Sequence, residues 1–227
     1  MFILAKVLHI CLFFYKIAFL KFEHFNKVFM SLIAYSIPFN RIQAWLEKEK
    51  ELGSPFPDRV VLATATPQGV PSSRIVAIRE LTEQGLVFFT QLGTKKTHEL
   101  RENPCASMTL WLALQQRQVI LDGNIISLTQ QENESFWKAL PQERQLRFST
   151  YAPLSGQPIS SAAILEDEFQ KLTKTFKDQP LPVCKHYCGY RLLPESISFY
   201  TLGTQNFSES IKYTLHHQQW KEQLISP

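Results

Sequence analysis

The sequence predicts a mainly β protein with flanking helices, an α+β domain built around an antiparallel barrel or sandwich. Five β-rich runs follow one another closely and are separated by turn residues or by one short helical segment. They cover residues 59–66, 71–81, 85–91, 106–114 and 117–128. Strands joined by such short links pair in antiparallel fashion, because a parallel pair needs a long crossover.

The first flanking element is a helix before the strands. Ile42, Trp45 and Leu46 recur at helical spacing, and Gly53 follows them as a stop. The segment 54–58 is rich in proline and predicts a rigid linker into the first strand. We therefore expect an amphipathic helix that covers one face of the sheet.

The remaining elements follow the fifth strand. Residues 129–148 and 159–176 are predicted to be helical, the second with a row of apolar residues on one face. Strands are predicted again at 187–203 and 211–225, and the last segment turns back on itself at 216–219. The expected order is helix, barrel strands, helices and closing strands.

Composition indicates a globular protein with one main domain. The chain has 227 residues, of which 44% are hydrophobic and 19% charged, and its formal net charge is +4. Residues 31–227 are long enough to bury a full core. The basic residues are scattered and form no block, so no nucleic-acid partner is expected. A small anionic ligand would suit this charge balance.

Four cysteines are too few for the disulfide framework of a secreted domain, and the default is a reducing, cytoplasmic location. Cys184 and Cys188 have a spacing that zinc sites sometimes use. A closed zinc site needs four ligands, however, and no second cluster follows in the sequence. We expect no metal.

Residues 1–30 form an apolar leader that differs from the rest of the chain. Lys6, His9, Lys16 and Lys21 interrupt it, so it lacks the roughly 20 apolar residues of a membrane helix. Met30 begins sequence of ordinary composition. An extension from an upstream start codon is the first interpretation. A membrane contact through residues 1–22 and a helix packed on the domain are the alternatives.

Two lysines lie where a helix disfavours cations. Gly93 and Thr94 end the third strand and begin a helix, with Thr94 as its expected N-cap, and Lys95 and Lys96 follow directly. A cation in the first turn opposes the helix dipole at a cost of about 0.3–1 kcal/mol. This placement indicates a bound anion, although a solvated lysine pair at a frayed helix end is the alternative.

Arg74 and Arg79 are further candidate anion ligands on the second strand. Because their numbers differ by an odd number, a regular strand would point them to opposite faces. A bulge or the end of the strand would be needed to bring both to one ligand. The sequence lacks dinucleotide-binding, P-loop and serine-hydrolase motifs, which removes support for those enzyme classes.

The segment 72–123, "SSRIVAIRELTEQGLVFFTQLGTKKTHELRENPCASMTLWLALQQRQVILDG", resembles the pyridoxamine 5′-phosphate oxidases. "SGQPIS", "ILEDEFQKL" and "WKEQLISP" extend the resemblance towards the C-terminus. It implies an FMN-binding split β-barrel, with the flavin at a homodimer interface. It also implies an oxidase in which a hydride passes from substrate to flavin and O2 reoxidises the flavin, giving H2O2.

By position, the resemblance implies which residues bind the cofactor. Arg74, Lys95 and Lys96 match contacts to the FMN phosphate, and Gln118 matches a glutamine near the flavin ring. The full set is Arg74, Ile75, Val76, Arg79, Phe89, Thr90, Lys95, Lys96, Gln118, Ser155 and Tyr200. No residue is identified as a catalytic acid or base.

The substrate half of the resemblance departs from the family. The implied substrate residues are Arg79, Phe136, Leu140, Arg144 and Asn206, and three of them are uncharged where the family binds a phosphate. Loss of cations predicts a preference for less charged, more apolar aromatic substrates. Vitamin B6 phosphates, the substrates of phenazine-biosynthesis oxidases, and a non-catalytic flavin- or pyridoxal-phosphate-binding role remain the alternatives.

Overall fold

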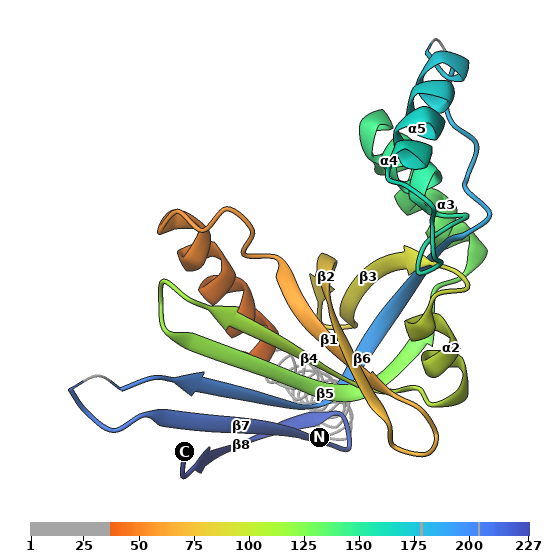
Figure 1. Ribbon diagram of the computed structural model, residues 1–227. Helices are drawn as coiled ribbons and strands as arrows, with labels where there is room; N and C mark the ends of the chain where they lie inside the picture. The colour runs from red at the N-terminus through yellow and green to blue at the C-terminus, as the bar shows by residue number, and fades with distance from the viewer. Residues whose placement is uncertain (1–36, 178, 204) are drawn as a thin grey trace, which may run out of the picture.

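The computed structural model describes residues 37–177, 179–203 and 205–227, and its centre is an antiparallel sheet (Figure 1). The strands are joined in the order β3-β2-β1-β4-β5-β6-β7-β8. Their bounds are β1 Arg59–Ala65, β2 Pro71–Thr82, β3 Gly85–Gln91, β4 Cys105–Leu112, β5 Arg117–Ser127, β6 Tyr187–Thr201, β7 Glu209–His216 and β8 Gln219–Ile225.

The sheet closes into a barrel because β3 also pairs with β6. The first half of the long strand β6 pairs with β3, from Tyr187 opposite Gln91 to Leu192 opposite Leu86. Its second half pairs with β7. Strands β1 to β6 therefore form a closed antiparallel barrel with flanking helices, the FMN-binding split-barrel fold, and β7 and β8 extend from it as a hairpin.

Alternation along the strands separates the core from the outer face. On β1, Val60 and Leu62 are buried in the barrel, whereas Val61 between them is exposed. Cross-strand partners share a face, so the residues opposite Val61 on β2 and β4 also point outwards. This alternation decides which candidate residues point into the barrel and which lie on its outer surface.

A helix over residues 37–51 packs Phe39, Ile42 and Trp45 against the barrel core. Glu49 of this helix is buried and accepts hydrogen bonds from the backbone N–H groups of Leu114 at 2.9 Å and Gln115 at 3.2 Å. These bonds attach the helix to the β4–β5 hairpin. The predicted amphipathic helix is confirmed, with Gly53 at its end in a left-handed conformation.

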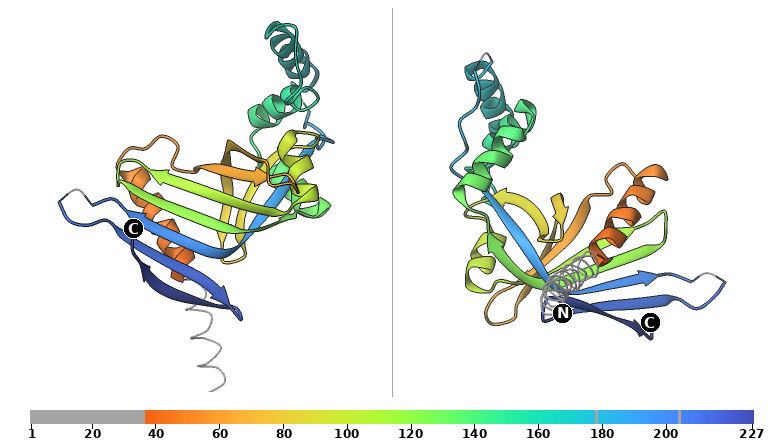
Figure 2. Two further views of the ribbon diagram at one scale, coloured as in Figure 1. Left: turned by 60° about the horizontal axis from the view of Figure 1, so that its bottom comes forward. Right: turned by 180° about the vertical axis from the view of Figure 1, so that it is seen from behind.

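The other helices are α2 (Lys95–Glu102), α3 (Gln130–Ala139), α4 (Gln142–Tyr151) and α5 (Ala163–Thr175). Figures 1 and 2 show α3, α4 and α5 as an arm that projects from one end of the barrel. A small core that includes Trp137, Leu146 and Tyr187 joins the arm to β6. The arm therefore has its own packing, continuous with the barrel at the start of β6.

The five predicted barrel strands and the closing strands are confirmed. The predicted helical segment 129–148 is wrong in one respect, because it breaks at Leu140–Pro141 into α3 and α4. Proline disfavours helical geometry in the residue before it, so Leu140 takes an extended conformation. The leader 1–30 lies outside the described residues. Among those that are described, no helix has the length and hydrophobicity to cross a membrane.

Candidate functional site

The first candidate site is a cluster of cations at the start of α2. Thr94 occupies the N-cap position, as predicted, but its hydroxyl does not cap the helix. That hydroxyl donates to the Gln91 carbonyl at 2.9 Å. The backbone N–H groups of Lys95 and Lys96 begin the helix and have no acceptor within it. The helix start therefore presents both charged side chains and backbone donors.

A buried carboxylate organises the neighbouring cation. Glu99 of α2 is 4% exposed and accepts hydrogen bonds from Ser72 at 2.6 Å and Thr64 at 2.5 Å. The Arg74 guanidinium pairs with the same carboxylate at 3.2 Å. Burial on its own would raise the pKa of Glu99, but the hydrogen bonds and Arg74 together hold it below its ordinary value. Glu99 is therefore a fixed anion that orients Arg74.

Lys96 is a partly buried cation without a carboxylate partner in the described part of the chain. Its ammonium donates to the hydroxyls of Thr90 at 3.0 Å and Thr94 at 3.3 Å. Burial, and secondarily the charge of Arg74, lowers its pKa. Lys95 is more exposed and approaches Glu99 at 3.7 Å. Arg74, Lys95 and Lys96, together called the α2 cluster, thus have one carboxylate beside them, and only Arg74 and Lys95 pair with it.

This donor set fits a phosphate monoester such as that of FMN. A dianionic group would neutralise the excess positive charge and accept hydrogen bonds from side chains and from the helix N–H groups. The structure brings together Arg74, Thr90, Lys95 and Lys96, as the sequence indicates. Glu99 was not predicted, because its partners Thr64 and Ser72 lie on strands distant from it in sequence.

The second candidate site begins at a bulge in β2. The β2–β3 register shifts between Ile78 and Glu80, so Arg79 is the extra residue. A bulge is therefore present at Arg79, although it does not bring Arg79 to the site of Arg74, which lies with Glu99. Its effect is to turn Arg79 out of the regular alternation and into a cavity between the barrel and the arm.

This cavity measures about 330 Å³, which is within the size range of small-molecule sites. Phe89 and Tyr187 stack with ring centroids 4.7 Å apart and planes 7° apart, forming a flat wall. Burial raises the pKa of Tyr187, so its phenol stays protonated. The complete lining is Arg59, Arg79, Phe89, Gln91, Leu140, Arg144, Arg147, Phe148, Tyr151 and Tyr187.

The predicted substrate residues are only partly gathered here. Arg79, Leu140 and Arg144 line the cavity. Phe136 lies behind the wall and packs on Phe89 at 4.9 Å between ring centroids. Asn206 is in the β6–β7 loop, at the end of that hairpin far from the arm (Figures 1 and 2). Within one chain, Asn206 therefore does not join the other four.

The remaining predicted cofactor residues lie elsewhere. Gln118 is opposite Tyr200 on β6 and opposite Trp111 on β4, on the outer face of the sheet. Ile75 shares that face and is 69% exposed. Val76 is buried in the core, so only its backbone is available to a ligand. Ser155 is in the turn after α4, on the arm. Ile75 and Val76 directly follow Arg74 on β2, whereas Gln118, Tyr200 and Ser155 lie on elements other than those of the α2 cluster.

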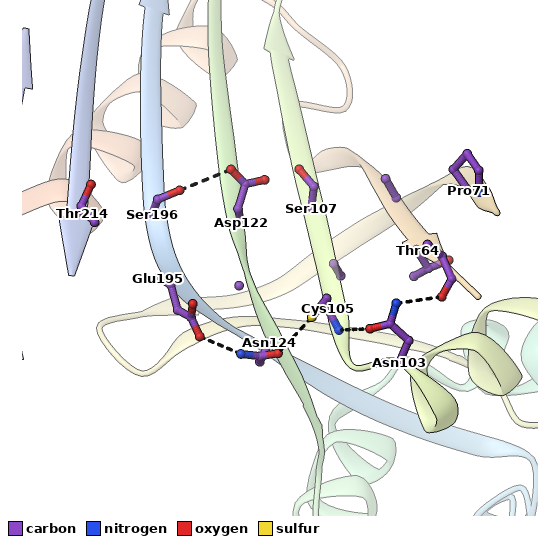
Figure 3. Close-up of a pocket in the computed structure, with 14 residues that line it drawn as sticks. Thr64, Pro71, Asn103, Cys105, Ser107, Asp122, Asn124, Glu195, Ser196 and Thr214 are labelled. Atoms are coloured by element: carbon purple, nitrogen blue, oxygen red, sulfur yellow. Dashed lines mark hydrogen bonds between the residues drawn. The ribbon is translucent and has the colours of Figure 1, made fainter. Parts of the chain in front are cut away.

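The outer face also carries a groove of about 590 Å³, whose lining includes several polar side chains (Figure 3). Ser107, Asp122, Ser196 and Thr214 form a row across β4, β5, β6 and β7. Ser196 donates to Asp122 at 3.3 Å. In residues 37–177, 179–203 and 205–227, no group of three or more His, Cys, Asp or Glu side chains could hold a metal ion. The groove therefore lies across the outward side of β4 to β7.

The fold and the α2 cluster define a split-barrel protein with a site suited to a phosphorylated ligand. The family described as pyridoxamine 5′-phosphate oxidase matches residues 55–175. A pyridoxine/pyridoxamine 5′-phosphate oxidase of Alteromonas mediterranea is 32% identical over 193 residues, covering 85% of this chain and 90% of the relative. The homologous oxidase of Paraburkholderia xenovorans is also 32% identical, over 192 residues, covering 84% and 89%. The chain belongs to the pyridoxamine 5′-phosphate oxidase family.

Solved structures support the fold. PhzG from Burkholderia lata, solved with tetrahydrophenazine-1-carboxylic acid, superposes with a TM-score of 0.74 at 24% identity, covering 84% of this chain and 92% of that one. A pyridoxamine 5′-phosphate oxidase-related, FMN-binding protein from Nostoc punctiforme gives 0.66 at 19% identity, covering 83% and 96%. At these identities the likeness concerns the fold alone.

Proposed function

We propose that this protein is an FMN-dependent oxidase that acts on a small aromatic substrate. The observation that carries the proposal is the α2 cluster, where Arg74, Lys95 and Lys96 surround a helix start and only the first two pair with a carboxylate, that of Glu99. Family membership supports the same cofactor. When bound, FMN supplies the redox chemistry, taking a hydride from the substrate and passing the electrons to O2 to give H2O2.

The chain's own residues contribute binding and orientation. Lys96 and Arg74 hold the phosphate, and Glu99 fixes the direction of Arg74. Phe89 and Tyr187 give the substrate ring a flat surface, and the cavity beside Arg79 limits its position. This arrangement excludes water from one side of the substrate. The described residues that line the cavity include no carboxylate or histidine to act as a general base.

We also propose that the active form is a homodimer. Ile75 and Trp111, 69% and 54% exposed, lie with Val61 on one outward face of the barrel. Gln118 and Tyr200, which the family resemblance assigns to the flavin, share this face. A second copy packed here would cover the apolar side chains and bring Gln118 and Tyr200 into a composite site.

The test is to purify the full chain and examine it for flavin and oxidase activity. The proposal expects a yellow protein that releases FMN on denaturation. It also expects peroxide under air with pyridoxamine 5′-phosphate or with a reduced phenazine carboxylate. A colourless protein that does not bind added FMN would contradict the cofactor. A flavin-loaded protein that is inert towards both substrate types would contradict the oxidase assignment.

A further inference from the structure

A buried arginine joins three elements of the fold and lies outside the lining of the cavity. Arg191 of β6 is 8% exposed. Its guanidinium donates to Glu80 of β2 at 2.9 Å and to Glu132 of α3 at 3.3 Å. A buried cation is costly unless carboxylates pair with it, and here two do. We call this set of three residues the Arg191 bridge.

On the barrel side, the bridge ends beside the bulge of β2. Glu80 is the residue that resumes the regular register after the bulge, and it lies opposite Val87 of β3. Val87 lies opposite Arg191 on β6, so the three residues form a row on one face of the sheet. The bond to Arg191 therefore fixes the residue that follows Arg79.

On the arm side, the bridge ends in the first turn of α3. One carboxylate oxygen of Glu132 accepts from the backbone N–H of Thr129 at 2.8 Å, as part of a capping box, and the other accepts from Arg191. These bonds, those of Thr129 first, hold the pKa of Glu132 below its ordinary value. The adjacent Asn133 accepts from the backbone N–H of Gly189 at 2.7 Å. The start of the arm is thus attached to β6.

The two ends of the bridge carry the two walls of the cavity. Arg79, beside Glu80, lies on the barrel wall. Leu140 ends α3 and lies on the arm wall, and the four cavity residues of α4 follow it along the chain. The direction in which α3 leaves the barrel therefore places the arm wall, and Arg191 bonds that helix and the bulge at the same time.

The bridge lies on the opposite face of β6 from the α2 cluster. Cys188 of β6 is opposite Thr90, whose hydroxyl accepts from Lys96. The β3–β6 register is regular from Tyr187 to Leu192, so residues 188 and 191 point to opposite faces. A change at Arg191 should therefore leave the cations of the α2 cluster in place.

We propose that Arg191 is a positioning residue that holds the two walls of the cavity in register and so sets the affinity for the aromatic substrate without touching it. The inference rests on the proposed function for the identity of the cavity as the substrate site. A guanidinium suits this role, because its planar fork donates to two carboxylates in fixed directions, whereas an ammonium is a point charge.

The first test is calorimetric titration of the flavin-loaded full chain with 4-deoxypyridoxine 5′-phosphate, an aromatic phosphate that lacks the oxidisable group. Arg191→Met keeps an apolar stem in the buried position and is expected to weaken probe binding by on the order of tenfold to a hundredfold. Its FMN affinity, from fluorescence titration, should stay within about threefold of wild type. Arg191→Lys should retain part of the probe affinity.

The two carboxylates give a second test of the same bridge. Glu132→Gln removes the charge but can keep the capping box, and Glu80→Gln removes the charge beside the bulge. Each should weaken probe binding in the wild-type background and have little further effect in Arg191→Met. Glu134→Gln is the matched control, because Glu134 bonds Gln130 within the same helix and lies outside the bridge. It should leave probe binding unchanged.

Urea denaturation separates positioning from stability alone. An ion-pair network with only a structural role would lower the free energy of unfolding and leave the probe affinity of the folded protein unchanged. That result for Arg191→Met would contradict the proposal. Equal losses of probe and FMN affinity would also contradict it, because the effect would then not be confined to the cavity.

Hydrogen exchange tests the bridge without any ligand. Arg191→Met should raise backbone exchange by about tenfold or more both at residues 129–133 and at residues 78–81, whereas Glu134→Gln should change neither segment. A rise in one segment alone, or in neither, would contradict a bridge between the walls. A wild-type protein that binds no probe but shows both rises would count against the proposed substrate cavity and not against the bridge.

Discussion

Lys96 lies among hydroxyl groups with its charge only partly solvated, beside the guanidinium of Arg74. This environment lowers the pKa of Lys96 from its ordinary value, since burial and a like charge both favour the neutral amine. A bound phosphate has the opposite effect, because it favours the protonated ammonium. Binding of FMN and protonation of Lys96 are therefore thermodynamically linked.

The linkage predicts that FMN affinity falls at alkaline pH. The FMN phosphate is already largely dianionic above about pH 7, so it contributes little change there. As pH rises through the pKa of Lys96 in the flavin-free protein, binding must take up a proton. The affinity should then fall towards tenfold per pH unit until the pKa of the bound state is reached.

Fluorescence titration with FMN from about pH 7 to pH 10 checks this prediction. Lys96→Arg keeps a charge throughout that range and is the matched control, so its affinity should change less. If FMN affinity fell with pH to the same extent in the wild type and in Lys96→Arg, Lys96 would not be the group whose deprotonation weakens phosphate binding.

At the scale of elements, the aromatic wall depends on close approach of β6 to β3. A Cβ atom on Gly189 of β6 would lie 2.4 Å from a ring carbon of Phe89 and 2.6 Å from the Leu128 side chain. Glycine at this position therefore allows Phe89 to stack on Tyr187. A larger residue at position 189 would collide with the Phe89 ring and disturb the aromatic wall.

Gly189→Ala is predicted to displace the Phe89 ring. The expected loss is about 1–3 kcal/mol of unfolding free energy, from overpacking, together with weaker binding of aromatic ligands in the cavity. Urea denaturation measures the first effect, and calorimetric titration with 4-deoxypyridoxine 5′-phosphate measures the second. An unchanged midpoint with unchanged ligand affinity would show that Phe89 does not depend on Gly189 for its position.

Sequence patterns predicted most elements of this fold, because strand alternation and helical periodicity are local. The odd spacing of Arg74 and Arg79 raised a bulge or a strand end as the way to bring both to one ligand, and the structure has a bulge at Arg79 but keeps the two arginines in separate sites. The partners of Glu99, in contrast, are set by the packing of α2 on β1 and β2, which no local pattern encodes. The family resemblance implied Arg79 and Arg144 as substrate residues, but their meeting with Arg59 and Arg147 in one cavity depends on how the arm packs against the barrel, which no local pattern encodes.

At the scale of the whole molecule, the predicted flavin residues are divided between two regions. Arg74 and Lys96 lie near the start of α2, whereas Gln118 and Tyr200 lie on the outer face with Ile75. A single chain does not bring them together. Under the proposed function, a flavin site that uses both regions would need a second copy of the chain.

Ile75→Glu combined with Trp111→Glu is predicted to produce a monomer with weakened flavin binding. Both side chains are exposed in the single chain, so the barrel should keep its stability while the interface gains buried charge. Size-exclusion chromatography with light scattering gives the molar mass of each variant in solution.

Leu224→Glu changes an exposed leucine on the other face of the sheet and is the control, which should stay dimeric. A double variant that stays dimeric would contradict this interface.

The measurement that tests the central claim most directly is the affinity for FMN compared with riboflavin, which lacks the phosphate. Wild-type protein should prefer FMN by about 10²–10⁴-fold, from two or more charge-assisted hydrogen bonds of roughly 1.5–3 kcal/mol each. Lys95→Ala with Lys96→Ala should remove most of this preference, whereas Arg101→Ala, in the last turn of the same helix, should leave it unchanged. If the double lysine variant kept the full preference for FMN, the start of α2 would not be the phosphate site.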